Sequence, residues 1–173
     1  EGLARSGAIA GLCPVTEANL GDGIFPASRF LASGGAFGVG SDSNVLIGLA
    51  DELRQLEYAQ RLGEQARNVI AEPGGTTGRR LFDGALAGGA QAMGIEAGIA
   101  EGLPASFFSL DNSAAPWLNG DQALDGFIFA GQVKPDCLWA NGVKQVEAGR
   151  HVRRAAIEAR FRKAMTALMA RSG

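Results

Sequence analysis

Residues 37–44 read FGVGSDSN, and this stretch indicates both the fold of the chain and the place of its chemistry. An apolar segment relieved by two glycines ends abruptly on Asp42, whose neighbours Ser41, Ser43 and Asn44 carry hydroxyl and amide groups. In a parallel β/α architecture the active site lies at the carboxyl ends of the strands, so a carboxylate at this point is a candidate metal ligand or base. The stretch therefore predicts a parallel strand that ends on a functional Asp42.

Length and composition indicate a globular chain. It has 173 residues, of which 46% are hydrophobic and 20% are charged, and this is enough to bury a core. The net charge of -2 argues against a nucleic-acid-binding protein, which needs a basic excess to neutralise phosphates. No apolar run approaches the roughly 20 residues that cross a bilayer, and no signal-peptide pattern opens the chain. We therefore expect a soluble, cytoplasmic protein without nucleic-acid or membrane partners.

The chain is poor in histidine and cysteine, two of the common zinc ligands. Cys13 and Cys137 are too few and too far apart in sequence for a zinc knuckle or a disulfide framework, so we expect both to be small buried hydrophobes. The single histidine, His151, lies far from Asp42 in a basic stretch. If Asp42 binds a metal, most of the other ligands lie outside this chain. The first methionine is Met93, which suggests a fragment, although tag removal or processing leaves the same trace.

Hydrophobic patterning predicts two consecutive βα units followed by an antiparallel segment. Strands are expected at 7–13, 37–41, 104–111, 133–139 and 143–147, helices at 28–32, 48–62, 77–93, 121–130 and 152–170, and a polar, Gly-punctuated loop at 16–23. Consecutive βα units imply a parallel sheet. The last two strands are expected to pair across Asn141-Gly142, because Asn-Gly is the strongest short hairpin signal.

The last predicted helix is basic and amphipathic. Its apolar residues fall on one stripe formed by Ile157, Phe161, Ala164, Met165 and Leu168. Such a helix can bind a membrane or a partner. Packing on the protein's own surface explains the stripe without a partner, and we favour that interpretation.

Candidate motifs for phosphate binding and for a catalytic triad lack the sequence context that these functions require. Residues 74–80, GGTTGRR, lack the Lys-Ser/Thr ending of a phosphate-binding loop and do not follow a predicted strand. A Ser-His-Asp triad would require His151 to reach Ser41 or Ser43, with no nucleophile-elbow spacing in support. The remaining candidates are carboxylates just past two strand ends, namely Asp42 and the segment 17–22.

The segment before Asp42 carries a family resemblance. Residues 12–26, LCPVTEANLGDGIFP, followed sixteen residues after Pro26 by Asp42, closely resemble the formimidoylglutamate deiminases, members of the amidohydrolase superfamily that act in bacterial histidine degradation. The wider deaminase group keeps only a looser Cys-Pro, Asn, Leu, Gly, Pro pattern there. Further matching segments are LRQLEY at 53–58, LFD at 81–83, GGA at 88–90, FIFAG at 127–131 and GRH at 149–151. The resemblance covers nearly the whole chain, but only the C-terminal part of the family.

This resemblance implies an α/β fold: strands 7 and 8, with helices, of a (β/α)₈ TIM-like barrel, part of a small β-rich accessory domain, and a C-terminal helix. The expected domains are residues 1–95 for the barrel part, 96–150 for the β-rich part and 151–173 for the amphipathic helix. Two strands cannot close a barrel, which takes roughly 250 residues. The missing N-terminal part of the barrel, or a homo-oligomer, is therefore the expected partner, and the chain alone is expected to be inactive.

The resemblance also implies one zinc ion and hydrolysis of N-formimidoyl-L-glutamate to N-formyl-L-glutamate and ammonia. In the family an Asp on the eighth strand completes a histidine ligand set, and Asp42 matches that Asp as ligand and proton acceptor. The family's histidines and substrate-binding residues have no matching position here. Ser43, Asn44, Glu17 and Asn19 are candidates for holding Asp42 by hydrogen bonds. Helix capping explains Ser43 and Asn44 equally well.

Two alternatives to this function stay open. The chain resembles other deaminases and chlorohydrolases of the superfamily more weakly, so one of these is the first alternative. The second is a non-catalytic α/β fragment that keeps the scaffold without the metal.

Overall fold

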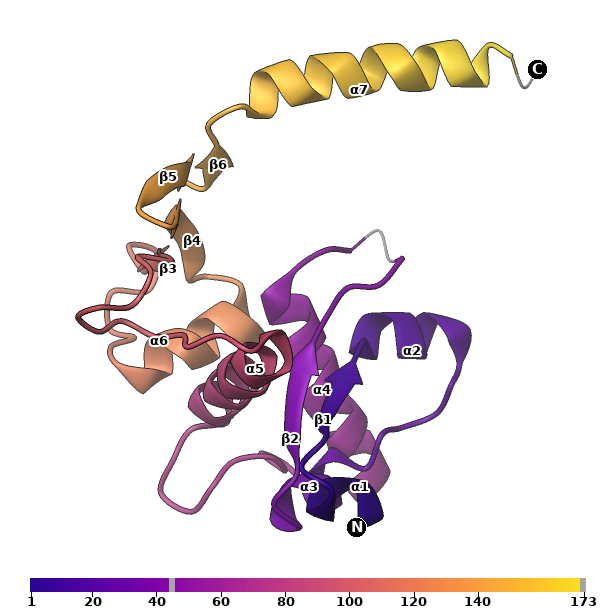
Figure 1. The fold of residues 1–173 in the computed structure, drawn as a ribbon, viewed down its shortest axis with the longest axis vertical. Coiled ribbons are helices and arrows are strands. Elements are labelled where there is room, and N and C mark those ends of the chain that lie inside the picture. Colours follow the sequence, from indigo (N-terminus) through magenta and orange to yellow (C-terminus); the bar gives the residue numbers. More distant parts are fainter. Residues whose placement is uncertain (44–45, 172–173) are drawn as a thin grey trace. The chain divides into compact units, whose positions relative to one another are not determined.

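The computed structural model describes residues 1–43 and 46–171, and the chain divides into two compact units. Unit 1 comprises Glu1–Gly98 and Asn112–Lys134, and unit 2 comprises Ile99–Asp111 and the described residues from Pro135 onward (Figure 1). The segment Asn112–Lys134 thus belongs with unit 1, whereas the sequence analysis grouped it with the β-rich part. The three domains expected at 1–95, 96–150 and 151–173 stay a prediction.

Unit 1 is built on a parallel strand pair. Its elements are α1 (Gly2–Arg5), β1 (Ile9–Leu12), α2 (Pro14–Leu20), α3 (Ala27–Ala32), β2 (Ala36–Val39), α4 (Leu49–Glu64), α5 (Thr77–Met93), α6 (Asp121–Asp125) and the π-helix η1 (Gly126–Ala130). The strands β1 and β2 lie side by side in parallel, in a register that places Leu12 opposite Val39 (Figure 1). Both strands and the helices α3, α4 and α5 confirm the expected pattern. Both strands therefore end at the same edge, where Asp42 was expected.

The region after β1 departs from expectation. The polar composition of residues 16–23 predicts a loop, but residues Pro14–Leu20 form α2. Pro14 occupies the first turn, where its missing N–H costs nothing, and the Glu17 carboxylate accepts a hydrogen bond from the Cys13 N–H at 2.8 Å. Gly21, with a left-handed φ of 73°, ends the helix. The prediction of a loop was wrong because these end signals outweigh the polar composition between them.

The core of unit 1 lies where α4 and α5 meet the sheet. Its fully buried side chains include Leu53 and Leu56 of α4, Leu81 of α5 and Ile128 of η1. The helix α5 packs directly on β2. The helix expected at 121–130 is present as two short pieces, the α-helical turn α6 and the π-helix η1.

Two buried polar side chains of α4 anchor loops of unit 1. Gln60 accepts from the Ala27 N–H at 3.0 Å and donates to the Phe25 carbonyl at 2.9 Å. Glu57 accepts from the N–H groups of Val69 and Ile70 at 2.9 and 3.1 Å. Buried polar groups are stable when they are hydrogen-bonded in this way, so α4 fixes the path of loops distant in sequence.

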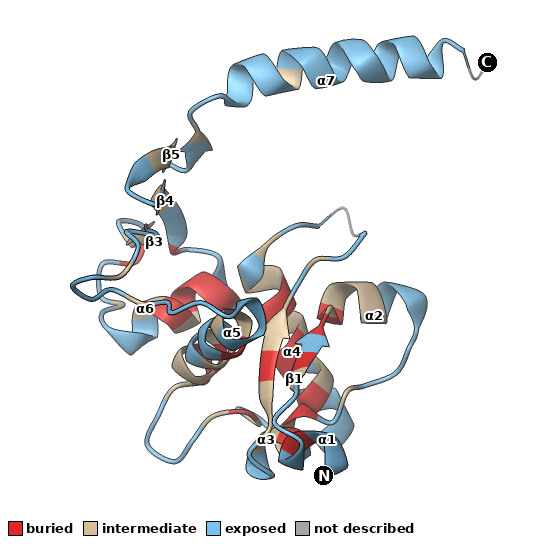
Figure 2. Ribbon diagram, viewed as in Figure 1, coloured by how far each residue is buried: buried red, intermediate tan, exposed pale blue. Residues whose placement is uncertain are grey.

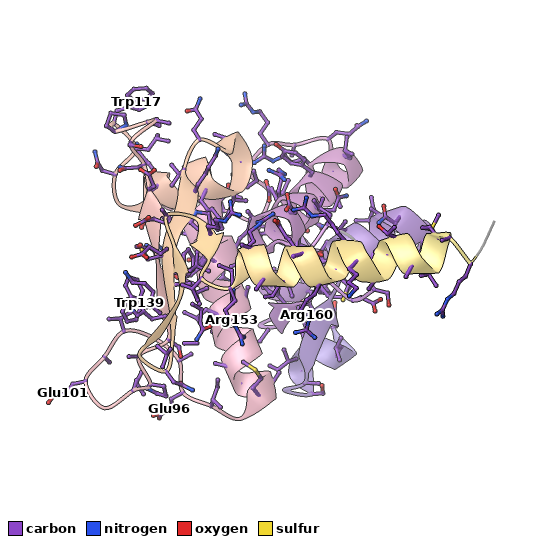
Figure 3. All side chains as sticks on the ribbon, turned by 90° about the horizontal axis from the view of Figure 1, so that it is seen from above. Glu96, Glu101, Trp117, Trp139, Arg153 and Arg160 are labelled. Carbon is purple, nitrogen blue, oxygen red and sulfur yellow. The ribbon has the colours of Figure 1, made fainter. Side chains whose placement is uncertain are left out.

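Unit 2 is a sheet followed by a helix. Its elements are β3 (Phe107–Asp111), β4 (Lys134–Ala140), β5 (Val143–Glu147), β6 (Arg150–His151) and α7 (Arg154–Met169), with the strands ordered β3-β4-β5-β6. The hairpin of β4 and β5 turns at Asn141 and Gly142, both with positive φ, which confirms the Asn-Gly prediction. Trp139, labelled in Figure 3, stacks on Phe107 with ring centroids 4.8 Å apart. Among its described residues, none of unit 2 is buried.

The helix α7 confirms the expected C-terminal helix but not its expected packing. No residue of Arg154–Met169 is buried, and Figure 2 shows the helix exposed except for one short intermediate stretch. Phe161, at the centre of the apolar stripe, is 63% exposed. Arg153 precedes the helix and Arg160 extends from it (Figure 3). Among the described residues of unit 2 nothing buries the stripe, and its packing on another surface of this chain stays a prediction. Within the same residues, no helix combines the length and apolarity that a membrane crossing requires.

Candidate active site at the carboxyl ends of the strands

Asp42 lies just past β2 at the carboxyl edge of the parallel pair. Its side chain is exposed, and its backbone adopts a left-handed conformation with φ of 48°, which Asp tolerates better than most residues. The Ser43 hydroxyl donates to Asp42 Oδ1 at 3.3 Å. The carboxylate is therefore presented at the edge where parallel β/α proteins carry out their chemistry.

The backbone that leads to Asp42 is held from the side of β1. The Gly40 N–H donates to the Leu12 carbonyl at 2.9 Å and continues the parallel ladder beyond the last paired residues. The Thr16 hydroxyl, on α2, donates to the Ser41 carbonyl at 3.2 Å. Two groups far from Asp42 in sequence thus fix the residues directly before it.

A thiol lies among carboxylates at this edge. Burial raises the pKa of the Cys13 thiol most, and the negative charges of Asp42, Glu52 and Glu17 raise it further. Glu52 is 2% exposed, and its Oε2 accepts from the Val15 N–H at 2.9 Å. The negative charges of three carboxylates therefore raise the pKa of one thiol beside the strand ends.

Cys13 and Glu52 lie at this edge although neither was predicted from the sequence as a site residue. Cys13 directly follows β1, so the strand-end rule that identified Asp42 could have found it. Glu52 carries no such signal, because an acidic residue near the start of a helix is usually solvated. Only the packing of α2 against α4 buries it.

The other residues considered for the site from the sequence lie at separate positions in the structure. Glu17 uses its carboxylate to cap the Cys13 N–H at the start of α2. Asn19 is exposed on α2, and within the described residues no hydrogen bond joins it to Asp42. Asn44 lies outside the described residues. His151 is in β6, where its Nδ1 accepts from the Arg153 N–H at 3.1 Å.

The described residues do not form a zinc site by themselves. A structural or catalytic zinc ion takes three or four protein ligands. In the parts of the chain that the structure describes, no group of three or more His, Cys, Asp or Glu side chains could hold a metal ion. Asp42 is exposed and anionic and can supply one oxygen ligand, so the other ligands of any such ion must come from elsewhere.

Solved structures define the class of protein. A crystal structure of an amidohydrolase from Brucella melitensis superposes on 96% of this chain and 38% of that chain, with a TM-score of 0.93 and 59% sequence identity. A zinc-bound adenosine deaminase from Xanthomonas campestris superposes on 97% of this chain and 39% of that one with a TM-score of 0.75, but at 20% identity it shows the fold alone. The chain has the α/β fold of part of an amidohydrolase of the TIM-barrel superfamily.

A curated relative indicates which group of amidohydrolases this chain resembles. The formimidoylglutamate deiminase of Pseudomonas aeruginosa is 52% identical over 134 residues, which are 75% of this chain and 29% of that protein. The resemblance to formimidoylglutamate deiminases is therefore confirmed, over less than a third of the relative's length. No protein-family model matches the chain.

Proposed function

We propose that this chain is the C-terminal part of an enzyme that hydrolyses N-formimidoyl-L-glutamate to N-formyl-L-glutamate and ammonia. The observation that carries the proposal is the 52% identity to a formimidoylglutamate deiminase. The exposed Asp42 just past β2 supports it, because barrel enzymes place their catalytic residues at this edge.

Asp42 is the residue of this chain that takes part in the reaction. Its carboxylate accepts a proton from the attacking water and passes it to the departing ammonia, which a positioned anionic group does well. A zinc ion, with Asp42 as one of its ligands, would supply a water of lowered pKa for the attack. Zinc-bound relatives of the same fold support this part of the proposal.

The proposal extends to partners and setting. The remaining ligands and the substrate-binding groups come from the region that precedes this part in its longer relatives. A role in histidine degradation and a cytoplasmic location rest on the sequence resemblance. The chain by itself is expected to be inactive.

The test uses the gene product that carries this chain, purified from its own host. Intact mass, zinc content and ammonia release from N-formimidoyl-L-glutamate are measured together. We expect a mass well above 17.8 kDa, about one zinc ion per chain, and turnover that Asp42→Asn lowers by about 100-fold or more. A single metal-free species of 17.8 kDa without turnover would establish the non-catalytic alternative. Ammonia release from guanine in place of formimidoylglutamate would establish a different deaminase.

A further inference from the structure

The position of the Asp42 carboxylate depends on its backbone rather than on packing of its side chain. Asp42 is exposed, and its described side-chain contact is with the adjacent Ser43. Its left-handed φ of 48° is uncommon outside glycine, and although Asp adopts it more readily than most residues, neighbouring groups that fix the backbone favour it. The groups that hold the preceding backbone therefore decide where the carboxylate points.

Thr16 supplies one of these groups in an unusual way. A Thr hydroxyl in a helix commonly bonds back to the carbonyl four residues earlier, which is Leu12. Here the Leu12 carbonyl accepts from Gly40, and the Thr16 hydroxyl instead crosses to the Ser41 carbonyl at 3.2 Å. The hydroxyl thus joins α2 to the residue immediately before Asp42.

The helix α2 is itself fixed at its start. The buried Glu52 of α4 accepts from the Val15 N–H, and Glu17 accepts from the Cys13 N–H. These bonds hold the first turn of α2, from which Thr16 extends. A chain of contacts therefore runs from Glu52 through the first turn of α2 and Thr16 to Ser41.

We propose that Thr16 and Glu52 are positioning residues for Asp42: they hold the first turn of α2 against the end of β2 and so aim the Asp42 carboxylate. The consequence for catalysis rests on the proposed function. A displacement of about 1 Å in a reacting group can cost on the order of 100-fold in rate, so the loss of one such bond should be measurable in kcat.

The experiment compares Thr16→Val, which removes the hydroxyl at similar size, with Thr16→Ser, which keeps it. In the gene product used above, Thr16→Val should lower kcat by about 10-fold or more with KM within about two-fold, and Thr16→Ser should restore most of the loss. In the same gene product, NMR reports the geometry without catalysis. The Ser41 carbonyl carbon should shift and the Asp42 amide should move or broaden in Thr16→Val, while both stay near their wild-type values in Thr16→Ser.

The two readouts separate failure of this inference from failure of the proposed function. If the wild-type protein does not turn over formimidoylglutamate, the proposed function fails, and the NMR comparison still decides whether Thr16 positions Asp42. Equal behaviour of Thr16→Val and Thr16→Ser in the Ser41 and Asp42 resonances would overturn the inference.

Glu52 provides a second pair of variants. Glu52→Gln keeps a side-chain oxygen that can accept from Val15, whereas Glu52→Met removes it. If Thr16→Val fails to fold, Thr16→Ala and the Glu52 pair give the same comparison. A change at the Asp42 amide in Glu52→Met but not in Glu52→Gln supports the inference, and an unchanged amide in both contradicts it.

Discussion

Gly88 of α5 lies against the backbone of Phe37 in β2, so closely that a Cβ atom at position 88 would come 1.9 Å from the Phe37 carbonyl oxygen. One turn earlier, a Cβ at Gly84 would come 2.6 Å from the Phe37 ring. The helix can therefore pack directly on the strand only because both positions lack a side chain. This contact fixes which face of β2, the strand that leads to Asp42, packs against α5.

Gly88→Ala should destabilise unit 1 strongly, whereas Gly89→Ala should not. The added methyl at 88 has no space and must displace α5, at about 3 kcal/mol. At Gly89 no atom lies within 4 Å of the added Cβ, and the exchange for a better helix former gains up to about 1 kcal/mol. Urea unfolding followed by circular dichroism measures both. Similar midpoints for the two variants would show that α5 does not pack as described.

Glu57 should be the most costly carboxylate to remove from α4. It is 0% exposed and accepts from Arg61 Nε at 2.7 Å as well as from Val69 and Ile70, so Glu57→Ala leaves buried donors unpaired. We expect a loss of about 3 kcal/mol or more in the free energy of unfolding. Asp83, whose side chain is 55% exposed beside Arg79, is the control. Asp83→Ala should cost less than about 1 kcal/mol, and an equal cost at both positions would refute the anchoring role.

The Cys13 thiol should titrate above the ordinary pKa of a cysteine. Burial is the main cause, and the charges of Asp42, Glu52 and Glu17 add to it. In a Cys137→Ser background, iodoacetamide alkylation measured against pH reports Cys13 alone. Asp42→Asn removes one negative charge and should lower the apparent pKa. An unchanged or higher pKa in Asp42→Asn would contradict the proximity of the two residues.

The raised pKa of Cys13 also predicts how the free energy of unfolding changes with pH. The folded state holds the thiol proton more tightly than the unfolded chain does, so the folded state binds more protons in the window between the two pKa values. The contribution of the Cys13 thiol to the free energy of unfolding is fully present below the pKa that the thiol has in the unfolded chain. It is lost as the pH rises through the pKa of the thiol in the folded state. Unfolding midpoints of wild type and Cys13→Ala, measured on both sides of the ordinary thiol pKa, check the sign. The wild type should lose more stability than Cys13→Ala as pH rises.

Truncation of the α7 stripe should leave the stability of this chain unchanged. Phe161 is 63% exposed, so Phe161→Ala removes little buried surface and should alter unfolding by less than about 0.5 kcal/mol. Leu56, at 2% exposure, is the contrasting position, and Leu56→Ala should cost about 2 to 5 kcal/mol. A clear loss of stability in Phe161→Ala would mean that the stripe packs on this chain in solution.

The amino-acid sequence alone determined most of the elements and the place of Asp42. The hairpin follows from Asn141-Gly142, a turn that needs only two adjacent residues with positive φ. The helix α5 follows from a pattern that ends at Gly94, a left-handed cap. Asp42 was located because the end of a strand is a local event in the sequence. Each of these signals acts over a few residues, so no tertiary information was required.

Only the tertiary structure decided which polar groups are buried and which apolar groups are not. The buried Glu52 accepts a hydrogen bond from Val15, 37 residues away, and the bond from Thr16 reaches Ser41, 25 residues away. The apolar stripe of α7 matches a packed helix in pattern, yet no described residue of unit 2 buries it. Burial and hydrogen bonding each require two surfaces in contact. The sequence pattern of one segment describes only one of these surfaces.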